Sequence, residues 1–322
     1  MMTKIKKMPG RPRRDHIDGI RVSLWYENLK LNLSASNSCQ LERIIEPEAF
    51  GQSVYGVPYH HNKWGVYRSG IHTPKPNLVA AAEFHAPGSS TIINSVLWEV
   101  IKGKKKLDWM LKEGIRQLSW DVQNVLYKTN KSKNSSELVS TLTRKNLSRL
   151  IRLANLDSLA AQIIFLRVAD NRNERTLALK IGQSIYQTLL IMCTYLPFCS
   201  SSFCAELIKL MQVYVFPLAH DGRKGIHIQC ENQFFHEVRQ LCNFRLAMED
   251  RGRVGMNEKD GVHATADWLS GKLGFHLQFA FSAPIFSKDG RIISEQRLKQ
   301  WGQEQLLTGH SDKFPPFDLF SD

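Results

Sequence analysis

The chain lacks the short sequence signatures that identify several large classes of protein. Its six cysteines form no Cys-x-x-Cys pair, and no Gly-rich segment has the spacing of a phosphate-binding loop. The most apolar window, residues 186–199, is interrupted by polar side chains and by Pro197, so it is too short and too polar for a transmembrane helix. The basic N-terminus is followed by no apolar run of the kind found in a secretory signal. We therefore expect reduced thiols in a cytoplasmic protein with no membrane partner.

Acidic side chains are absent or scarce in two segments. Residues 1–14 carry six basic side chains and no acidic one, and residues 102–152 carry thirteen basic and four acidic side chains. These two segments together have a formal net charge of +15, whereas the whole chain has +13, so the remainder is almost neutral. Positive charge concentrated in this way favours a polyanionic partner such as DNA. The alternative interpretation is a solvated basic surface with no specific partner.

The part of the chain that follows the basic arm is predicted to be a small helical domain. We place this domain at residues 15–102, after a disordered arm of residues 1–14. A segment rich in Gly, Pro and aromatic residues at 51–59 predicts a loop or a short hairpin. Apolar residues recur at helical spacing on both sides of that segment. The four predicted helices cover residues 20–33, a segment ending at 45, residues 61–69 with Gly70 as C-terminal cap, and residues 77–84.

The run Gly103-Lys104-Lys105-Lys106 is the predicted boundary to a second domain, which is an all-α helical bundle. Apolar residues at every third or fourth position predict one continuous helix over residues 107–126, with Asp108 as its N-terminal cap. A polar loop is expected next, followed by a capping box made of Asn134 and Glu137. Further helices are predicted from 157, from 171 or 173, over 203–218 and over 231–248.

The last part of the chain, residues 251–322, is predicted to be loop-rich with a small β-element. Residues 251–261 are polar and Gly-rich, which is typical of a flexible loop, and residues 275–281 alternate apolar and polar side chains like a strand. Asp289-Gly290 between apolar residues predicts a hairpin turn. The expected fold is mainly α: a small N-terminal helical domain, an all-α helical bundle over 103–250, and a minor β-hairpin near the C-terminus.

One segment of the first domain resembles a DNA-binding motif. The pattern Trp64-x-x-Tyr67-x-x-Gly70-x-x-Thr73-Pro74, followed by Leu78 and Ala81-Ala82-Glu83, resembles the recognition-helix end of phage-repressor (Cro-type) helix-turn-helix domains over about 25 residues. The preceding scaffold departs from that family, because Glu46-Pro47 and the long segment 50–60 replace the tight turn between the second and third helices. The alternative is an ordinary capped helix with a core tryptophan.

The resemblance implies a helix that reads DNA. Trp64 and Tyr67 would anchor it, while neighbouring side chains would present hydrogen-bond donors to bases and phosphates. The N-terminal stretch Pro9-Gly10-Arg11-Pro12-Arg13 resembles an AT-hook core, which implies arginines inserted into a narrow minor groove; a basic tail with phosphate affinity alone is the alternative. The residues expected to contact DNA are Lys6, Lys7, Arg11, Arg13, Arg14, His61, Asn62, Lys63, Tyr67, Arg68, Lys104, Lys105 and Lys106.

Patterns with catalytic or metal-binding chemistry are weak. His227, Cys230, His236 and Cys242 fall close together without the spacing of a zinc site. His85 near Ser89 and Ser90 lies on a Pro-Gly turn, where the serines are better explained as a helix cap. The acidic pairs Asp170 with Glu174 and Asp260 with Asp267 are better explained as solvated ion pairs. We predict no catalytic residues, no metal and no cofactor.

The leading hypothesis is a cytoplasmic bacterial DNA-binding protein of regulatory, phage or mobile-element origin. In this hypothesis the arm and the helical reader hold DNA, and the helical bundle mediates oligomerisation or contact with a protein partner. The alternative is a helical interaction component of an anti-phage or transposition assembly, which contacts nucleic acid held by a partner. A third hypothesis is a nuclease with dispersed carboxylates.

Overall fold

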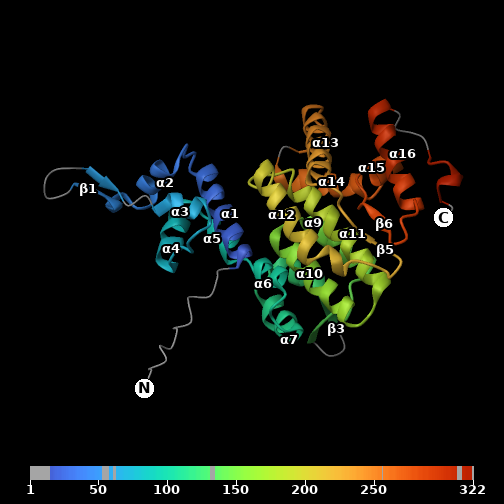
Figure 1. Cartoon of the computed structure of the whole chain (residues 1–322), viewed down its shortest axis with the longest axis horizontal. Coiled ribbons are helices and arrows are strands. Elements are labelled where there is room, and N and C mark those ends of the chain that lie inside the picture. The colour runs from blue at the N-terminus through green and yellow to red at the C-terminus, as the bar shows by residue number, and fades with distance from the viewer. Residues whose placement is uncertain are drawn as a thin grey trace, which may run out of the picture. The chain divides into compact units, whose positions relative to one another are not determined.

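The computed structural model describes residues 15–52, 58–60, 63–130, 135–255, 257–309 and 314–320. The fold is mainly α, as predicted, and the chain divides into two compact units, Met1–Ile93 and Asn94–Asp322 (Figure 1). The division therefore lies before the predicted boundary at residues 102 and 103. The reason is packing, since Arg167 of the second unit donates to the carbonyl oxygens of Val100 and Ile101, both at 2.9 Å. The arm of residues 1–14 lies outside the described residues.

Unit 1 is built from short helices that begin at polar caps. The Asp15 carboxylate accepts from the backbone N–H of Ile17, and the Asn37 side chain accepts from that of Gln40, which fixes where the first two helices start. The predicted loop or hairpin at 51–59 contains an antiparallel pair in which Gly51 faces Tyr59. The elements are α1 (His16–Asn32), α2 (Ser38–Ile45), η1 (Pro47–Ala49), β1 (Phe50–Gln52), β2 (Pro58–His60), α3 (Lys63–Arg68), α4 (Pro76–His85) and α5 (Ser89–Asn94).

Unit 2 is a helical bundle with α10 and α11 at its centre (Figure 1). The elements are α6 (Leu97–Lys102), α7 (Leu107–Trp109), the π-helical turn η2 (Met110–Gly114), α8 (Trp120–Leu126), β3 (Tyr127–Asn130), β4 (Ser135–Leu138), α9 (Arg144–Leu153), α10 (Leu156–Asn171), α11 (Arg175–Met192), α12 (Ser201–Tyr214), η3 (Phe216–Leu218), β5 (Lys224–Ile226), α13 (Glu231–Asp250), α14 (Glu258–Leu269), α15 (Phe275–Ala280), β6 (Ile285–Ser287), α16 (Ser294–Thr308) and η4 (Phe317–Phe320).

The centre of unit 2 is the pair α10 and α11. Nearly every side chain of α10 from Ser158 to Ala169 is buried, which a helix surrounded by other helices requires. A hydrogen bond between their buried faces joins Gln162 Nε2 to Thr188 Oγ1 at 2.9 Å. No described helix combines the length and the apolar character needed to cross a membrane.

The predicted single helix over residues 107–126 is wrong. The helix breaks before Trp120, where the backbone N–H of Ser119 donates to Asp157 at 2.9 Å and the Gln123 amide donates to the carbonyl oxygen of Leu118 at 2.7 Å. These side chains satisfy the backbone groups that a continuous helix would have paired internally. Asp108 does not cap α7; it lies in its first turn and pairs with Lys112 at 2.9 Å.

The capping box predicted at Asn134 and Glu137 is also wrong. Glu137 lies in β4, opposite Lys128 of β3, in an antiparallel pair that also places Tyr127 opposite Leu138. Opposite charges facing each other across two strands stabilise such a pair. Asn134 lies outside the described residues.

The C-terminal region is more helical than predicted. Residues 275–280 form α15 instead of a strand, because Phe275 and Phe279 stack on one side at 6.2 Å between ring centroids while Leu277 and Ala280 are buried on the other. The turn at Asp289-Gly290 does not join a local hairpin. β6 pairs instead with β5, which places Ile285 opposite Ile226, and α14 and α16 occupy much of the region expected to be loop.

Candidate nucleic-acid interface

The third helix of unit 1 is anchored by an aromatic cluster. Trp64 is fully buried, its indole stacks on that of Trp25 with 5.6 Å between ring centroids, and Tyr67 meets it edge-on at 5.7 Å. Trp25 lies on α1, so the main aromatic partner of Trp64 comes from the first helix. The anchoring role predicted for Trp64 and Tyr67 agrees with this packing.

A carboxylate from the preceding loop fixes the start of α3. Glu46 accepts from the indole Nε1 of Trp64 at 2.9 Å, and its other oxygen accepts from the ammonium of Lys63. Glu46 belongs to the Glu46-Pro47 pair, where the sequence differs from the helix-turn-helix pattern. In the structure its carboxylate anchors the start of α3. The charge of Lys63 is therefore balanced within unit 1.

Tyr67 does not fit its expected role as a DNA contact. Its side chain is only 8% exposed, and burial raises the pKa of its phenol, so it packs the core of unit 1. Arg68 is exposed and forms no ion pair with any described residue. His61 and Asn62 lie outside the described residues. Among the described residues of α3 that we expected to contact DNA, Arg68 is therefore the exposed and unpaired cation.

The end of α3 is set by two glycines. Gly70 adopts φ +64°, its N–H donates to the carbonyl oxygen of Tyr67 at 2.9 Å, and the N–H of Ile71 donates to that of Val66 at 3.1 Å. A Cβ atom on Gly70 would lie 2.4 Å from the carbonyl oxygen of Gly19 on α1. Gly70 therefore has the backbone conformation predicted for the cap, and it packs directly against Gly19 of α1.

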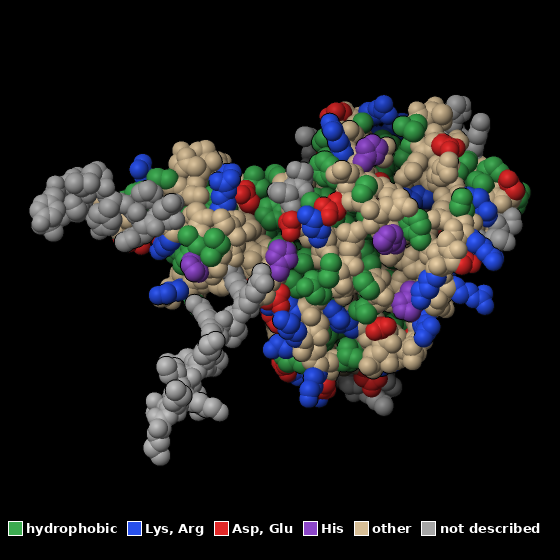
Figure 2. Space-filling model, viewed as in Figure 1, with side chains coloured by type: hydrophobic (Ala, Val, Ile, Leu, Met, Phe, Trp, Pro, Cys, Tyr) green, Lys and Arg blue, Asp and Glu red, His purple; other side chains and the backbone are tan. Residues whose placement is uncertain are grey.

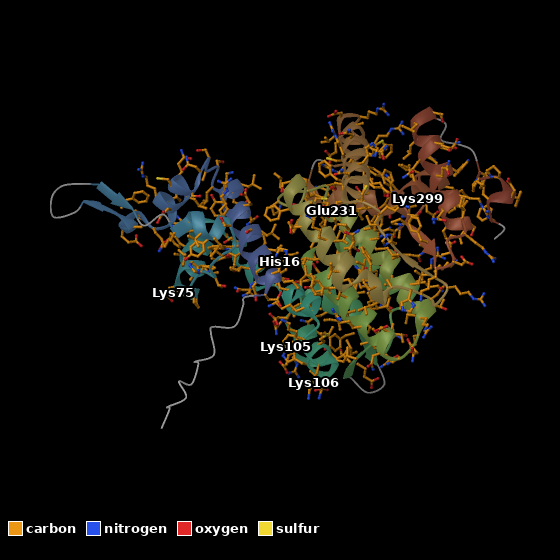
Figure 3. All side chains as sticks on the ribbon, viewed as in Figure 1. His16, Lys75, Lys105, Lys106, Glu231 and Lys299 are labelled. Atoms are coloured by element: carbon orange, nitrogen blue, oxygen red, sulfur yellow. The ribbon has the colours of Figure 1, made fainter. Side chains whose placement is uncertain are left out.

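Three lysines follow directly on α6 in unit 2. Gly103 ends that helix with φ +65°, and the guanidinium of Arg167 holds its last carbonyl oxygens, so the turn after it has a fixed direction. Lys104, Lys105 and Lys106 are all exposed there, and the ammonium of Lys105 lies 5.3 Å above the ring of Trp109. Lys and Arg side chains gather over α6 and α7 in Figure 2, and Figure 3 labels Lys105 and Lys106.

A second basic feature of unit 2 lies within the basic segment 102–152, but its residues were not among the expected DNA contacts. α9 turns Leu147 and Leu150 inward and leaves Arg144, Lys145 and Arg149 exposed. Its N-terminus carries a capping box between Thr143 and Asn146, and the Asn146 amide also donates to the carbonyl oxygen of Val125 at 2.7 Å, which joins α9 to α8.

An exposed tryptophan lies at this junction. Trp120, the first residue of α8, is 75% exposed, and it lines a cavity of about 350 Å³ together with Arg149, Arg152 and His263. Arg152 is paired with Asp267, whereas Arg149 forms no ion pair with a described residue. The available signal was helical phase, since Trp120 lies two positions from buried Val122 and so points away from the core.

The weaker sequence patterns resolve into structural roles. The carboxylate of Glu83 accepts from the backbone N–H groups of Gly88 and Ser90 at 2.6 and 2.7 Å, so it caps α5, where we had expected the serines to do so. Asp267 pairs with Arg152 and Lys272, as expected for an ion pair, and Glu174 lies 4.0 Å from Arg172. Within the described ranges, no three His, Cys, Asp or Glu side chains form a group that could hold a metal ion.

The chain matches no protein-family model, no curated protein sequence and no solved structure.

Proposed function

We propose that this chain is a DNA-binding protein of regulatory, phage or mobile-element origin. The proposal depends on one observation, the segregation of a net charge of +15 into residues 1–14 and 102–152 of a chain whose total is +13. In unit 2, much of this charge is presented to solvent by what we call the basic set: Lys104, Lys105, Lys106, Arg144, Lys145 and Arg149.

The basic set suits contacts with phosphates. Each cation that neutralises a phosphate releases counterions, so binding of this kind weakens steeply as salt rises. Phosphate contacts fix the position of a protein on the duplex and carry no base specificity. Specificity in this proposal comes from the N-terminal arm, by analogy with the AT-hook, and from the outer side of α3 with Arg68. Trp120 and Arg149 line the same cavity and so offer a flat ring and a cation at one site, which suits stacking on an unpaired base.

Binding of the full chain to a fluorescently labelled duplex, measured by anisotropy at increasing salt, tests the proposal. Charge reversal of Lys104, Lys105 and Lys106 to Glu should lower the affinity for all sequences. It should also reduce the slope of log K against log salt by about 2.7, because each lost phosphate contact contributes about 0.9.

The matched control reverses three other exposed cations of unit 2, Arg251, Arg253 and Lys259, which changes the net charge equally outside the basic segments. This variant should retain the slope of the unmodified chain. An equal loss in both variants would mean that only net charge matters. Absence of salt-dependent binding by the unmodified chain would contradict the proposal.

A second candidate function has its own supporting observation. Leu307, Phe314 and Phe317 are 79%, 76% and 93% exposed, and apolar side chains grouped near one end of a chain are typical of a protein-binding surface. This favours a helical component that meets nucleic acid through a partner or a second copy. Light scattering of the full chain and of Leu307→Ser with Phe317→Ser would detect self-association, which the substitutions should abolish.

A further inference from the structure

Unit 2 contains a cavity of about 680 Å³ that the proposed DNA contacts do not explain. It is bounded by α9, α11, α14, α15, β6 and α16. Pockets for small molecules commonly have volumes of about 300 to 1,000 Å³, so the size admits a drug-sized ligand.

The charged side chains that line this cavity are mainly cationic. Arg144 of α9 and Lys180 of α11 both line it, both are exposed, and neither forms an ion pair with a residue in the described part of the chain. The acidic side chain in the lining, Glu295, is already paired with Lys224. The cavity therefore offers two positive charges with no counter-charge from the protein, which favours an anionic ligand.

A buried hydroxyl group in the same lining has no hydrogen-bond partner. Ser184 is 4% exposed, and its Oγ contacts no donor or acceptor among the described residues. A serine or threonine inside a helix ordinarily donates to the carbonyl oxygen four residues earlier, as Thr265 does to Gly261 at 2.7 Å. Leaving a buried polar atom unpaired is unfavourable, and such an atom needs a physical explanation. A ligand that accepts a hydrogen bond from Ser184 supplies one, provided that the lining side chains move, because less than 1 Å² of the Oγ atom is accessible.

The rest of the lining is largely apolar. Leu147 and Ile151 of α9, Leu269 of α14, Phe279 of α15 and Leu298 of α16 contribute aliphatic and aromatic surface. A ligand that fills the cavity would bury apolar groups against these side chains, which stabilises its binding. Uncharged polar side chains such as Gln183, Gln187 and Gln278 also line the cavity, and they offer further hydrogen bonds to a ligand.

We propose that this cavity binds a small organic anion, whose carboxylate, sulfonate or phosphate group lies between Arg144 and Lys180 and whose apolar body packs against Leu147, Ile151 and Phe279. Ser184 donates a hydrogen bond to an acceptor atom of the same ligand once the side chains that cover its Oγ move aside. Arg144 also belongs to the basic set, but Lys180 and the rest of the lining do not. The DNA contacts are tested at Lys104, Lys105 and Lys106 and the cavity with the sulfonate, so either proposal can fail while the other stands.

The probe pair 8-anilinonaphthalene-1-sulfonate and N-phenyl-1-naphthylamine tests the proposal, because the two share an aromatic body and differ in the sulfonate. Titration of the full chain, followed by fluorescence and calorimetry, should show one sulfonate bound per chain. Loss of two charge-assisted hydrogen bonds in Arg144→Gln with Lys180→Gln should weaken it by about 10- to 100-fold. The neutral amine should bind more weakly and be insensitive to these substitutions.

Two further variants separate the site from general effects. Lys112→Gln with Arg116→Gln removes the same two charges from exposed positions outside the cavity and should leave sulfonate binding unchanged. Ser184→Ala should weaken the sulfonate by about 2- to 10-fold, yet leave the thermal midpoint of the free protein unchanged or higher, because the unpaired hydroxyl is gone. A purely structural serine would lower the midpoint instead.

Equal binding of the two probes, equal effects of the two double variants, or several equivalent sulfonate sites per chain would each overturn the proposal. Circular dichroism of every variant should show that it is folded. A loss of binding in a folded variant can then be attributed to the substituted side chains.

Discussion

The ammonium Nζ of Lys299 lies 2.9 Å from the carboxylate Oε2 of Glu237 inside unit 2, with side chains only 8% and 1% exposed. The same ammonium donates to the carbonyl oxygens of Ala280 and Ser282 at 3.1 and 2.6 Å, and the hydroxyl of Tyr186 donates to the same Oε2 at 2.9 Å. Burial raises the pKa of Glu237 and lowers the pKa of Lys299, because the interior disfavours both charged forms. Figure 3 labels Lys299.

Breaking this pair on one side should be costly. Lys299→Met leaves the carboxylate of Glu237 buried without its cation, and we expect the free energy of unfolding to fall by about 3–5 kcal/mol. Lys299→Met combined with Glu237→Leu should recover much of that loss, because neither charge is then buried. Urea unfolding of the two variants and of Glu237→Leu alone measures the coupling. Additive losses would show that the charges themselves do not interact.

Gly70 and Gly19 should respond very differently to alanine. Gly70→Ala places a side chain at φ +64° and directs it at the backbone of Gly19, so we expect unit 1 to lose about 2 kcal/mol or more. Gly19→Ala meets the Gly70 carbonyl oxygen at 3.4 Å and gains helix propensity in α1, so it should be neutral or stabilising by about 0.5–1 kcal/mol. Hydrogen exchange of residues 16–32 follows unit 1 by itself, and equal protection in the two variants would contradict this argument.

Trp64 should matter more for packing than for its hydrogen bond. Trp64→Ala empties a fully buried site against Trp25 and should destabilise unit 1 by about 3–5 kcal/mol. Trp64→Phe keeps an aromatic ring but loses the hydrogen bond from Nε1 to Glu46, so its effect should be smaller. Hydrogen exchange of α1 ranks the two variants. A larger effect of Trp64→Phe would mean that Glu46, and not ring packing, holds α3.

The cap of α5 should make the stability of unit 1 depend on pH. The backbone N–H of Ser90, with that of Gly88, holds the pKa of Glu83 below its ordinary value. A depressed pKa means that the stabilisation is complete above the unfolded value of 4.5 and is lost as pH falls through the folded value. Glu83→Gln should therefore be less stable than the unmodified chain at neutral pH, and the difference should shrink on acidification. Urea midpoints of both proteins across this range provide the measurement, and a constant difference would contradict the assignment.

Local patterns predicted much of the helical fold and little of the sites. The helix predicted over 231–248 is present as α13. The prediction succeeded because the apolar residues are spaced so that they lie on one buried face of the helix. The strand predicted over residues 275–281 was wrong, because the spacing of their apolar side chains is compatible with a strand and also with a helix in which Phe275 stacks on Phe279. The pairing of β6 with β5 has no local signal, since its partner is sixty residues away. The exposure of Trp120 has a local signal in its position relative to Val122, whereas the helix break before it depends on a contact with distant Asp157.

The pairing of Glu237 with Lys299 also orders events during synthesis. Unit 1 makes its contacts within the first 93 residues, so those contacts are complete on the ribosome well before the chain is finished. Unit 2 differs, because Tyr186 and Glu237 emerge long before the lysine that pairs with them. Until α16 has left the exit tunnel, that carboxylate has no cation in its own fold and the groove left for α16 stays open. The nascent bundle therefore has an incomplete core until α16 packs against it.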